Sequence, residues 1–375
     1  MAKPWPVLLM VRELGIGGCE RDVTKIAIGL NRSHFEPHVG CFHPEGLRTA
    51  QLKAAGVPIV HFPVRSFKSR SALEGIARMR DYLSEHRIRI VHSYDVPMNL
   101  FGAPVARLFR APIVITSQLA YRALFRPMSR HLLRITDQLS DRIVVNCEAM
   151  RRHMMEDEKV PSGRLYLCYN GVETEIFHPV NGEPKPALLK DAALVVGVVC
   201  ALRPEKRVDL LLEAFARVRH LRRGLKLFVL GSGPLLSDLL AQAARLGMAE
   251  DCVFEPASSE VAPWMRAIDI FVLPSVSEAF SNALLEAMAS GCCPIGSRVG
   301  GTPELIAHEE RGFVFEPGNA EDLAAKLAVL IQDDDLRLRF AAASARFARE
   351  QLSVEIAVGR MEDLYTRLIL EKCGP

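Results

Sequence analysis

The sequence predicts an α/β protein with two doubly wound domains, each a parallel β-sheet covered by helices on both faces. Short apolar runs alternate with amphipathic helical stretches along the whole chain, which is the pattern of βαβ units. The alternation stops once, at residues 172–190, where three prolines occur without any periodicity. The chain has 375 residues, 49% of them hydrophobic, so it can fill two cores of ordinary size.

The first half contains seven apolar runs of strand length. They span residues 7–11, 38–42, 59–62, 88–92, 113–116, 143–145 and 165–168. Helical periodicity between them is clearest at residues 20–30, 72–86 and 132–139. We therefore predict one domain over residues 1–172, followed by a linker over residues 173–190.

The alternation restarts after the linker and predicts a second domain over residues 191–354. Its expected strands span residues 194–200, 225–230, 252–254, 270–273, 293–296 and 312–315. Its expected helices span residues 208–220, 234–246, 261–268, 282–290 and 320–331, and a last helix spans 355–371. Ligands of such sheets bind beyond the carboxyl ends of the strands, so substrates are expected in a cleft between two facing sheets.

Charge and cysteine content narrow the function classes. Residues 1–180 carry 25 Lys+Arg and 17 Asp+Glu (+8), while the remainder carries 22 and 27 (−5). A basic half favours an anionic surface or substrate, although an arginine-rich solvated surface gives the same count. None of the nine cysteines forms a CxxC pair, which argues against structural zinc and favours a reducing compartment. No apolar run reaches the ~18 residues of a membrane span, and 7–11 is too short for a signal peptide.

The most informative segment runs from Ser275 to Glu304, SVSEAFSNALLEAMASGCCPIGSRVGGTPE. Glu278 and Glu286 stand eight positions apart, across a predicted strand-to-helix turn with Ser281 as the helix N-cap. A helix N-terminus binds anions, and a carboxylate on each side can accept hydrogen bonds from hydroxyls. A ligand with phosphates in its middle and hydroxyls at both ends fits this layout, and nucleotide sugars are such ligands.

Two further loops could contact phosphates. Three cations, Arg203, Lys206 and Arg207, lie between a strand end and a helix start, where they could hold a diphosphate; surface charge before a helix is the alternative. Gly17 and Gly18 follow the first strand and could let a ligand approach the backbone, or could form only a tight turn. The Gly231–Pro234 turn (GSGP) is more simply structural.

Arginines recur every four residues at positions 122, 126, 130 and 134, which on one helix would form a basic stripe, with Leu132, Leu133 and Ile135 available to an apolar face. Pro127 limits how far that helix extends backward. Such a stripe could rest on anionic lipid head groups, or could be a solvated face. His92 and His178 are isolated, and an isolated histidine is usually a hydrogen-bonded structural residue.

With these motifs in view, the chain resembles the retaining GT-B glycosyltransferases of family 4 along nearly its whole length. The segment SEAFSNALLEAMASG, with Glu278-x7-Glu286, is similar to the family signature. The segment YNGVE at 169–173, with Phe177 and Pro179, is similar to the family's segment that enters the linker. Further matches are DRIVV at 141–145, GSGP at 231–234, LRPEK at 202–206, GG-x-ER at 17–21 and GG-x-x-E at 300–304.

The resemblance implies two Rossmann-like domains facing a cleft, with the last helix, about 355–372, packing back on the first domain. It implies sugar transfer from a nucleotide sugar to a hydroxyl with retention of anomeric configuration and without a required metal. It implies that Lys206, helped by Arg203, holds the diphosphate, with Gly17 and Gly18 close to it. Glu278 should contact the donor sugar and Glu286 the ribose hydroxyls. The amides of Phe280, Ser281 and Asn282 should contact sugar and diphosphate.

Two positions depart from the family pattern. Cys200-Ala201 replaces a Gly-Arg pair whose arginine stands five residues before the lysine, so Arg203 is the candidate substitute. Gln118 stands where many members have a histidine after the strand at 113–116, which bears on acceptor-side contacts. His92 resembles a common family histidine, and we expect His92 and Gln118 on the acceptor side.

We therefore expect a retaining hexosyltransferase with a UDP-sugar as the favoured donor, no cofactor or metal, and no nucleic-acid partner. The expected acceptor is a sugar or a lipid-linked molecule in cell-surface polysaccharide synthesis. The expected location is cytoplasmic, with possible peripheral contact with the anionic inner face of the plasma membrane. The alternatives are a nucleotide-sugar-binding protein without transfer activity and another GT-B enzyme, such as an epimerase or a phosphorylase. A dehydrogenase is disfavoured because the first loop lacks GxGxxG.

Overall fold

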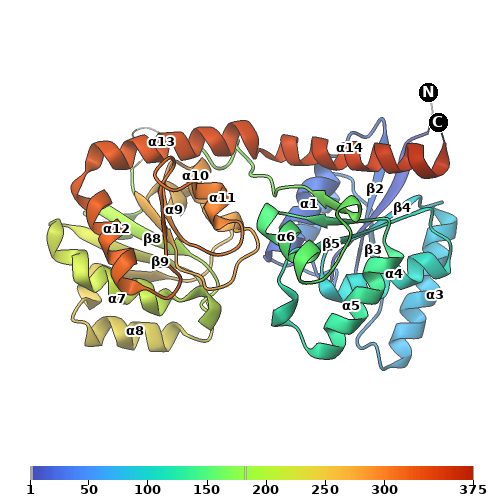
Figure 1. Cartoon of the computed structure of the whole chain (residues 1–375), viewed down its shortest axis with the longest axis horizontal. Helices are drawn as coiled ribbons and strands as arrows, with labels where there is room; N and C mark the ends of the chain where they lie inside the picture. The colour runs from blue at the N-terminus through green and yellow to red at the C-terminus, as the bar shows by residue number, and fades with distance from the viewer. Residues whose placement is uncertain (1–2, 181, 183, 375) are drawn as a thin grey trace. The chain divides into compact units, whose positions relative to one another are not determined.

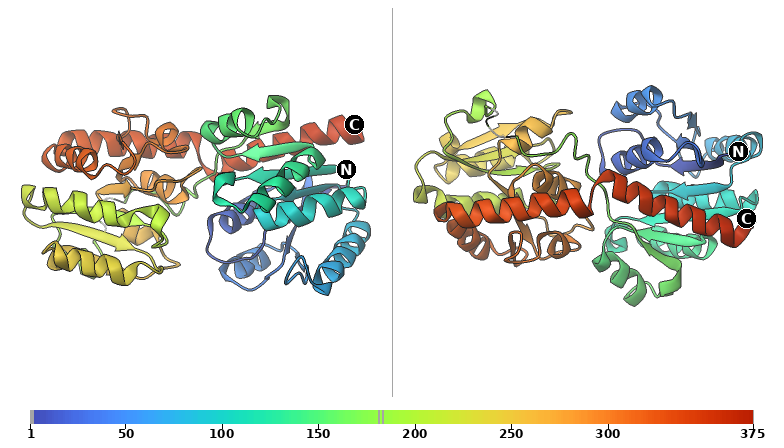
Figure 2. Two further views of the ribbon diagram at one scale, coloured as in Figure 1. Left: turned by 60° about the horizontal axis from the view of Figure 1, so that its bottom comes forward. Right: turned by 90° about the horizontal axis from the view of Figure 1, so that it is seen from above.

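The computed structural model describes residues 3–180, 182 and 184–374, and it divides the chain into two compact units. Unit 1 comprises Met1–Gly171 and Val354–Pro375, and unit 2 comprises Val172–Ser353. Each unit is a sheet with helices on both faces (Figures 1 and 2). This confirms the predicted α/β class with two doubly wound sheets. Residues 181 and 183 of the predicted linker lie outside the described residues.

Unit 1 has a seven-stranded parallel sheet in the order β3-β2-β1-β4-β5-β6-β7. Each strand overlaps one of the seven predicted apolar runs, and the order reverses direction at β1/β4, as in a doubly wound fold. The strands are β1 (Trp5–Met10), β2 (Phe35–Cys41), β3 (Ile59–His61), β4 (Ile90–Ser93), β5 (Ile113–Gln118), β6 (Arg142–Val145) and β7 (Leu165–Leu167).

Helices of unit 1 cover both faces of this sheet. They are α1 (Gly18–Gly29), α2 (Leu47–Ala54), α3 (Arg70–Glu85), α4 (Val96–Leu108), α5 (Pro127–Leu139), α6 (Glu148–Glu156) and α14 (Val354–Cys373). The C-terminal helix α14 packs against α1, and Met361, Leu364 and Tyr365 are buried in the same core as strands β1 and β5. Helices α2, α4 and α6 were not singled out by the periodicity, because α2 and α6 are short and α4 carries apolar residues nearly all round.

Unit 2 has a six-stranded parallel sheet in the order β10-β9-β8-β11-β12-β13. The strands are β8 (Leu194–Val199), β9 (Leu225–Leu230), β10 (Cys252–Glu255), β11 (Ile270–Leu273), β12 (Cys293–Ser297) and β13 (Phe313–Phe315). The helices are α7 (Val208–Val218), α8 (Leu236–Arg245), α9 (Ala262–Arg266), α10 (Asn282–Ala289), α11 (Thr302–Ile306), α12 (Ala320–Gln332) and α13 (Asp334–Gln351). All six predicted strands are present.

The segment predicted as a linker groups with unit 2 in the structure. Phe177 is buried, and Arg266 Nη1 donates to the carbonyl oxygen of Ile176 over 3.3 Å. Lys185 Nζ lies 3.3 Å from a carboxylate oxygen of Asp269. The proline-rich composition therefore marks irregular backbone that is attached to the second sheet by side-chain contacts.

The predicted stripe of four arginines on one helix is wrong at its first member. Arg122 lies in a short 3₁₀ helix, Arg122–Leu124, which ends before α5 begins at Pro127. Its side chain is fully buried, whereas Arg126 and Arg134 are exposed. Pro127 explains the break, since a proline is tolerated at the first position of a helix and not inside it.

Candidate functional site

The candidate site lies at the carboxyl edge of the unit 2 sheet, where four loops follow four neighbouring strands. The loops follow β8, β9, β11 and β12 and span residues 200–207, 231–235, 274–281 and 298–301. Because the strands are parallel, all four loops leave the sheet at the same edge. The predicted donor residues Arg203, Lys206, Glu278 and Phe280 all lie on these loops.

Backbone hydrogen bonds join these loops to one another. Leu202 N donates to Ser232 O over 3.0 Å, which joins the β8 loop to the β9 loop. Val276 N donates to Glu205 O over 2.9 Å, which joins the β11 loop to the β8 loop. The β12 loop is attached in the same way, by Gly301 N donating to the carbonyl oxygen of Ala279 over 2.7 Å. The loops therefore form one connected surface.

Three glycines permit this close approach of backbones. A Cβ on Gly231 would lie 1.9 Å from the carbonyl oxygen of Cys200, and one on Gly233 would lie 2.4 Å from that of Leu202. Gly300 has a φ of +51°, and its Cβ would lie 1.8 Å from the carbonyl oxygen of Glu278. The GSGP turn and Gly300 therefore have a packing role: any side chain there would push the loops apart.

Lys206 and Glu278, both predicted catalytic residues, form an ion pair across the β8 and β11 loops. Lys206 Nζ contacts Glu278 Oε1, and the side chains are 23% and 12% exposed. Ser275 Oγ donates to the same carboxylate oxygen over 2.9 Å. Glu278 therefore has one charged partner that a ligand could displace and one neutral partner on its own loop.

Helix α10 begins directly after the β11 loop. Ser281 caps it as predicted, since its Oγ accepts a hydrogen bond from Leu284 N at 3.3 Å. The first-turn amides and the dipole of the helix favour negative charge at this end. Phe280 and Ser281 are largely buried, Asn282 is partly exposed, and Glu286 is 2% exposed one turn into the helix.

Cys200 and Ala201, which replace the Gly-Arg pair of the family pattern, lie on the β8 loop. Ala201 is exposed, so the place of the family arginine carries no charge. Arg203 is also exposed, and it forms no ion pair with any other residue in the described part of the chain. Burial raises the pKa of the Cys200 thiol to about 12, so this cysteine is an uncharged packing residue.

Of the residues predicted on the acceptor side, His92 is fully buried in unit 1. Its Nδ1 lies 2.8 Å from Tyr365 Oη, and its Nε2 lies 2.8 Å from Ser117 Oγ. Burial lowers the pKa of His92 to about 3, so the ring is neutral at physiological pH. His92 links the sheet to α14 and offers no exposed surface to a ligand; any effect on an acceptor would be indirect.

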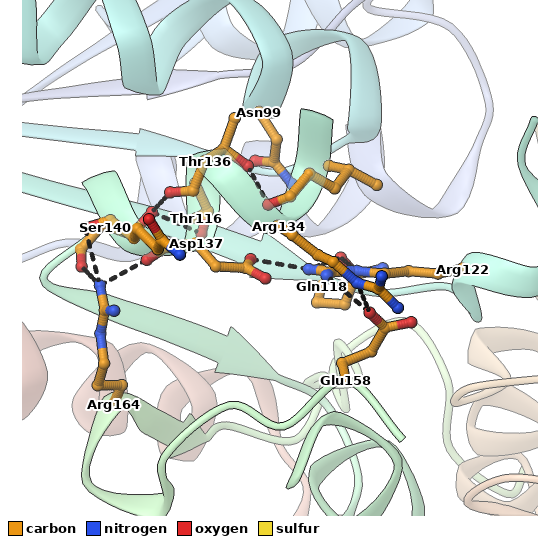
Figure 3. Close-up of polar contacts among 12 residues, drawn as sticks. Asn99, Thr116, Gln118, Arg122, Arg134, Thr136, Asp137, Ser140, Glu158 and Arg164 are labelled. Carbon is orange, nitrogen blue, oxygen red and sulfur yellow. Dashed lines mark hydrogen bonds and ion pairs between the residues drawn. The ribbon is translucent and has the colours of Figure 1, made fainter. Parts of the chain in front are cut away.

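Gln118 is also buried, at the carboxyl end of β5, and its amide holds the loop that follows (Figure 3). Its Nε2 donates to the carbonyl oxygen of Ala120, and its Oε1 accepts from the guanidinium of Arg122 at 3.2 Å. The position occupied by a histidine in many members of the family therefore has a structural partner here.

Gly17 and Gly18 lie in unit 1, at the start of α1. Gly17 precedes the helix and Gly18 is its first residue. A Cβ on Gly17 would meet only the end of the flexible Glu20 side chain. Their contact with the donor stays a prediction.

Residues 3–180, 182 and 184–374 contain neither a cluster of metal-ligating side chains nor a helix able to span a membrane. No group of three or more His, Cys, Asp or Glu side chains is placed to hold a metal ion there. No helix in these ranges combines the length and the apolar character needed to cross a bilayer.

Sequence reasoning missed two residues of functional interest. Ser275, which holds Glu278, lies in the quoted signature segment, but a serine before a loop carries no distinctive spacing. Tyr365, which holds His92, is 273 positions away from it along the chain, and only the docking of α14 brings the two together.

Two family models match successive halves of the chain. Residues 16–176 match the model described as Glycosyltransferase Family 4, and residues 182–347 match the model described as Glycosyl transferases group 1.

Among curated relatives, the sulfoquinovosyl transferase SQD2 of Arabidopsis thaliana is 26% identical over 75% of this chain. The match covers 59% of that relative, which is less than two thirds of its length. A GDP-mannose-dependent α-(1-6)-phosphatidylinositol monomannoside mannosyltransferase of Mycobacterium tuberculosis is 27% identical over 83% of this chain and 84% of its own.

The fold is similar to that of solved glycosyltransferases. HepE of Anabaena, solved with UDP and glucose, superposes with a TM-score of 0.86 at 18% identity, covering 97% of this chain and 100% of HepE. WaaG, a glycosyltransferase of lipopolysaccharide biosynthesis, gives a TM-score of 0.75 at 19% identity, covering 96% and 99%. With both halves matched by glycosyltransferase models and this fold, the chain belongs to the GT-B glycosyltransferases.

Proposed function

We propose that the protein transfers a sugar from a nucleotide-sugar donor to a hydroxyl acceptor with retention of anomeric configuration. The observation that carries the proposal is the Lys206–Glu278 pair, which lies just before the N-terminus of α10 on a connected loop surface. A cation, a helix N-terminus and two carboxylates, Glu278 and Glu286, are what a diphosphate with a hydroxyl-bearing group at each end requires.

Donor binding exchanges the partner of Lys206. The incoming diphosphate competes with Glu278 for the ammonium group, and it is further held by the amides at the start of α10. Glu278 is released to accept hydrogen bonds from the donor sugar. Ser275 keeps Glu278 oriented during the exchange, because its hydroxyl already binds Oε1 at 2.9 Å. The ion pair is thus a resting arrangement of the site.

The remaining donor contacts follow the same geometry. We assign the ribose hydroxyls to Glu286, which lies one turn into α10. Arg203 is exposed on the β8 loop and replaces the charge absent at Ala201. UDP is the nucleotide to test first, since the solved HepE complex contains UDP and glucose; the M. tuberculosis relative is named for GDP-mannose.

The chemical step is a front-side substitution at the anomeric carbon. The bond from this carbon to the diphosphate oxygen breaks, and the acceptor oxygen forms its bond on the same face of the sugar. The acceptor proton passes to the departing phosphate oxygen, so neither a carboxylate nucleophile nor a metal is required. Lys206 and Arg203 stabilise the charge that grows on the diphosphate. One such charge-assisted hydrogen bond contributes ~1.5–3 kcal/mol, roughly ten- to a hundredfold in rate.

For the acceptor we propose a sugar or a lipid-linked molecule, used in cell-surface polysaccharide synthesis at the inner face of the plasma membrane. Two findings support this choice. Residues 1–180 have a net charge of +8, and the M. tuberculosis relative is named for a phosphatidylinositol-linked acceptor.

A thermal-shift screen of nucleotide sugars tests the donor site, because a ligand that binds only the folded state raises its melting temperature. A positive donor is then incubated with the enzyme in water, and slow release of free sugar reveals a working catalytic centre. The anomer formed first, read by proton NMR, tests retention, and unchanged turnover in EDTA tests metal independence.

The absence of charge at Ala201 favours a second function, nucleotide-sugar binding without transfer. The same incubation separates the two functions. A donor that raises the melting temperature but is neither hydrolysed nor transferred, even by an Ala201→Arg variant, would support the binding protein and contradict the transferase.

A further inference from the structure

The pairing of strands β11 and β12 ends at a buried hydroxyl group to which the donor site described above gives no role. The register of the two strands runs as far as Leu273 and Gly296. Pro274 follows on the β11 side, and it has no N–H group with which to extend the ladder. Ser297, the last residue of β12, follows on the other side and is fully buried. A buried hydroxyl is costly unless it makes a hydrogen bond, so the partner of Ser297 is informative.

The hydroxyl of Ser297 holds the main chain of the β11 loop. Ser297 Oγ donates to the carbonyl oxygen of Ser275, a residue that is also fully buried. This carbonyl oxygen accepts no other hydrogen bond from the residues that the structure describes. The side chain of Ser297 therefore takes the place of the strand pairing that stops at Pro274, and it attaches the start of the β11 loop to β12.

Ser275 connects this attachment point to the carboxylate of Glu278. Its Oγ donates to Glu278 Oε1 over 2.9 Å, and Lys206 Nζ contacts the same oxygen. Glu278 Oε2 accepts no hydrogen bond from any described residue, and the side chain is 12% exposed. Both protein partners thus hold one oxygen of the carboxylate, and the second oxygen is left for a ligand.

The attachment through Ser297 matters most when a donor is bound. In the exchange proposed above, the diphosphate takes Lys206 away from Glu278, so Ser275 becomes the remaining protein partner of this carboxylate. The position of Ser275 in turn depends on the hydrogen bond from Ser297. A carboxylate that is already held in place loses less conformational entropy when it binds a hydroxyl, so the support increases affinity for the group that Glu278 contacts.

We propose that Ser297 is a positioning residue for recognition of the donor sugar. Through Ser275 it holds Glu278 so that Oε2 accepts a hydrogen bond from a hydroxyl of the sugar. The nucleotide part of the donor does not depend on this support, because we assign its diphosphate to Lys206 and α10 and its ribose to Glu286. A serine that only stabilised the fold would affect sugar and nucleotide alike. This inference rests on the proposed donor site and adds a residue to it.

The test compares the affinities of the full-length protein for UDP-glucose and for UDP by isothermal titration calorimetry. Ser297→Ala should weaken UDP-glucose binding about fivefold, the effect of one hydrogen bond, and leave the affinity for UDP unchanged. A double-mutant cycle with Glu278→Ala shows whether Ser297 acts through the carboxylate. Once Glu278 is removed, the further change Ser297→Ala should have no effect on UDP-glucose binding.

Ser344 provides a matched control in the same unit. It is also fully buried, and its Oγ donates to the carbonyl oxygen of Cys292 over 3.3 Å, so Ser344→Ala removes the same kind of hydrogen bond. Ser344→Ala should lower the melting temperature by an amount similar to Ser297→Ala, without changing the ratio of the two affinities. Ser275→Ala removes the next hydroxyl of the chain and keeps the main-chain acceptor of Ser297, so it should reproduce the fivefold loss even if Ser297→Ala does not fold.

A crystal structure of Ser297→Ala without ligand tests the positioning itself and does not depend on which sugar the protein accepts. We expect the main chain at Ser275 to shift and the distance from Ser275 Oγ to Glu278 Oε1 to exceed about 3.5 Å. A Ser275–Glu278 hydrogen bond that is unchanged in this variant would overturn the proposal.

Three binding results would also overturn it: an unchanged affinity for UDP-glucose in Ser297→Ala, equal losses for UDP and UDP-glucose, or a full fivefold loss from Ser297→Ala after Glu278 has been removed. Binding of UDP by the parent protein keeps the two proposals separate. A parent protein that binds neither nucleotide contradicts the proposed UDP-sugar donor, whereas one that binds both, with a ratio that Ser297→Ala does not change, contradicts only the role of Ser297.

Discussion

The carboxyl edges of the two sheets use their polar residues in opposite ways. In unit 2 the conspicuous residues, Lys206 and Glu278, are partly exposed and satisfied mainly by each other. In unit 1 the conspicuous residues, His92 and Arg122, are fully buried, and each has several fixed partners. Polar residues at strand ends can therefore support ligand chemistry only where a ligand can replace their present partners.

The loops at the two edges are also held in place by different kinds of contact. In unit 2 the loops are held by backbone contacts that Gly231, Gly233 and Gly300 make possible. The charged side chains are therefore not needed to hold the loops in place. In unit 1 the loop after β5 is held by the side chains of Gln118 and Arg122. Substitutions should therefore damage activity in unit 2 and stability in unit 1.

The largest expected effect is on stability, in unit 1. Arg122→Ala leaves the buried Asp137 without its ion-pair partner and Glu158 with Arg134 alone, and breaking a buried pair costs about 3–5 kcal/mol. Urea denaturation should show this loss, while Arg130→Ala, which removes a cation without an ion pair, should stay within about 0.5 kcal/mol of the parent. Equal stability of the two variants would contradict the structural role of Arg122.

The next effect is on turnover, in unit 2. Lys206→Ala removes the cation assigned to the departing diphosphate, and turnover should fall about a hundredfold. The melting temperature should change little, because the lysine is partly exposed and its loop is held by backbone contacts. Lys190→Ala, an exposed lysine of the same unit, is the matched control. Normal turnover in Lys206→Ala would remove this residue from the mechanism.

A pH titration of stability tests the buried state of His92. Burial lowers its pKa from 6.5 to about 3, so the folded protein binds fewer protons than the unfolded chain between these values. The contribution of His92 to the free energy of unfolding is complete above pH 6.5. It falls as the pH falls, and roughly 2 kcal/mol is lost at pH 5. His92→Gln should lack this loss, whereas the exposed His178→Gln should retain it.

The buried carboxyl group of Asp95 gives a pH dependence of stability opposite to that of His92. Burial raises the pKa of Asp95 to about 6, so the folded protein binds this proton more tightly than the unfolded chain. The contribution of Asp95 to the free energy of unfolding is therefore lost as the pH rises through that value. Asp95 is present in both the parent and the His92→Gln variant, and its effect cancels in their difference. Parallel stability curves for the two proteins between pH 7.5 and 5 would show that His92 is not held neutral by the fold.

The smallest predicted effect concerns donor affinity. Glu286→Gln keeps the shape of the side chain but removes the charge that accepts hydrogen bonds from ribose, so donor binding should weaken about tenfold. Isothermal titration calorimetry measures this directly. Glu321→Gln, an exposed glutamate in the first turn of α12, is the control. Unaltered affinity in Glu286→Gln would count against the ribose assignment.

The sequence was sufficient to predict the thirteen strands found in the described residues, because buried parallel strands are continuous apolar runs bounded by turn residues. It was also sufficient for the Ser281 cap, whose partner lies three residues away. It was not sufficient for Ser275, Tyr365 or the inward turn of Arg122. Those contacts depend on how distant segments pack, and spacing along the chain carries no record of them. The four-residue spacing of arginines even predicted the wrong face for Arg122.

We propose above that the carboxyl edge of unit 2 binds the diphosphate of a nucleotide sugar. A crystal structure with bound UDP tests it most directly. We expect phosphate oxygens within about 3 Å of Lys206 Nζ and of the first amides of α10. Glu278 should be separated from Lys206 and still bound to Ser275. A well-ordered nucleotide bound elsewhere, with the Lys206–Glu278 pair intact, would contradict it.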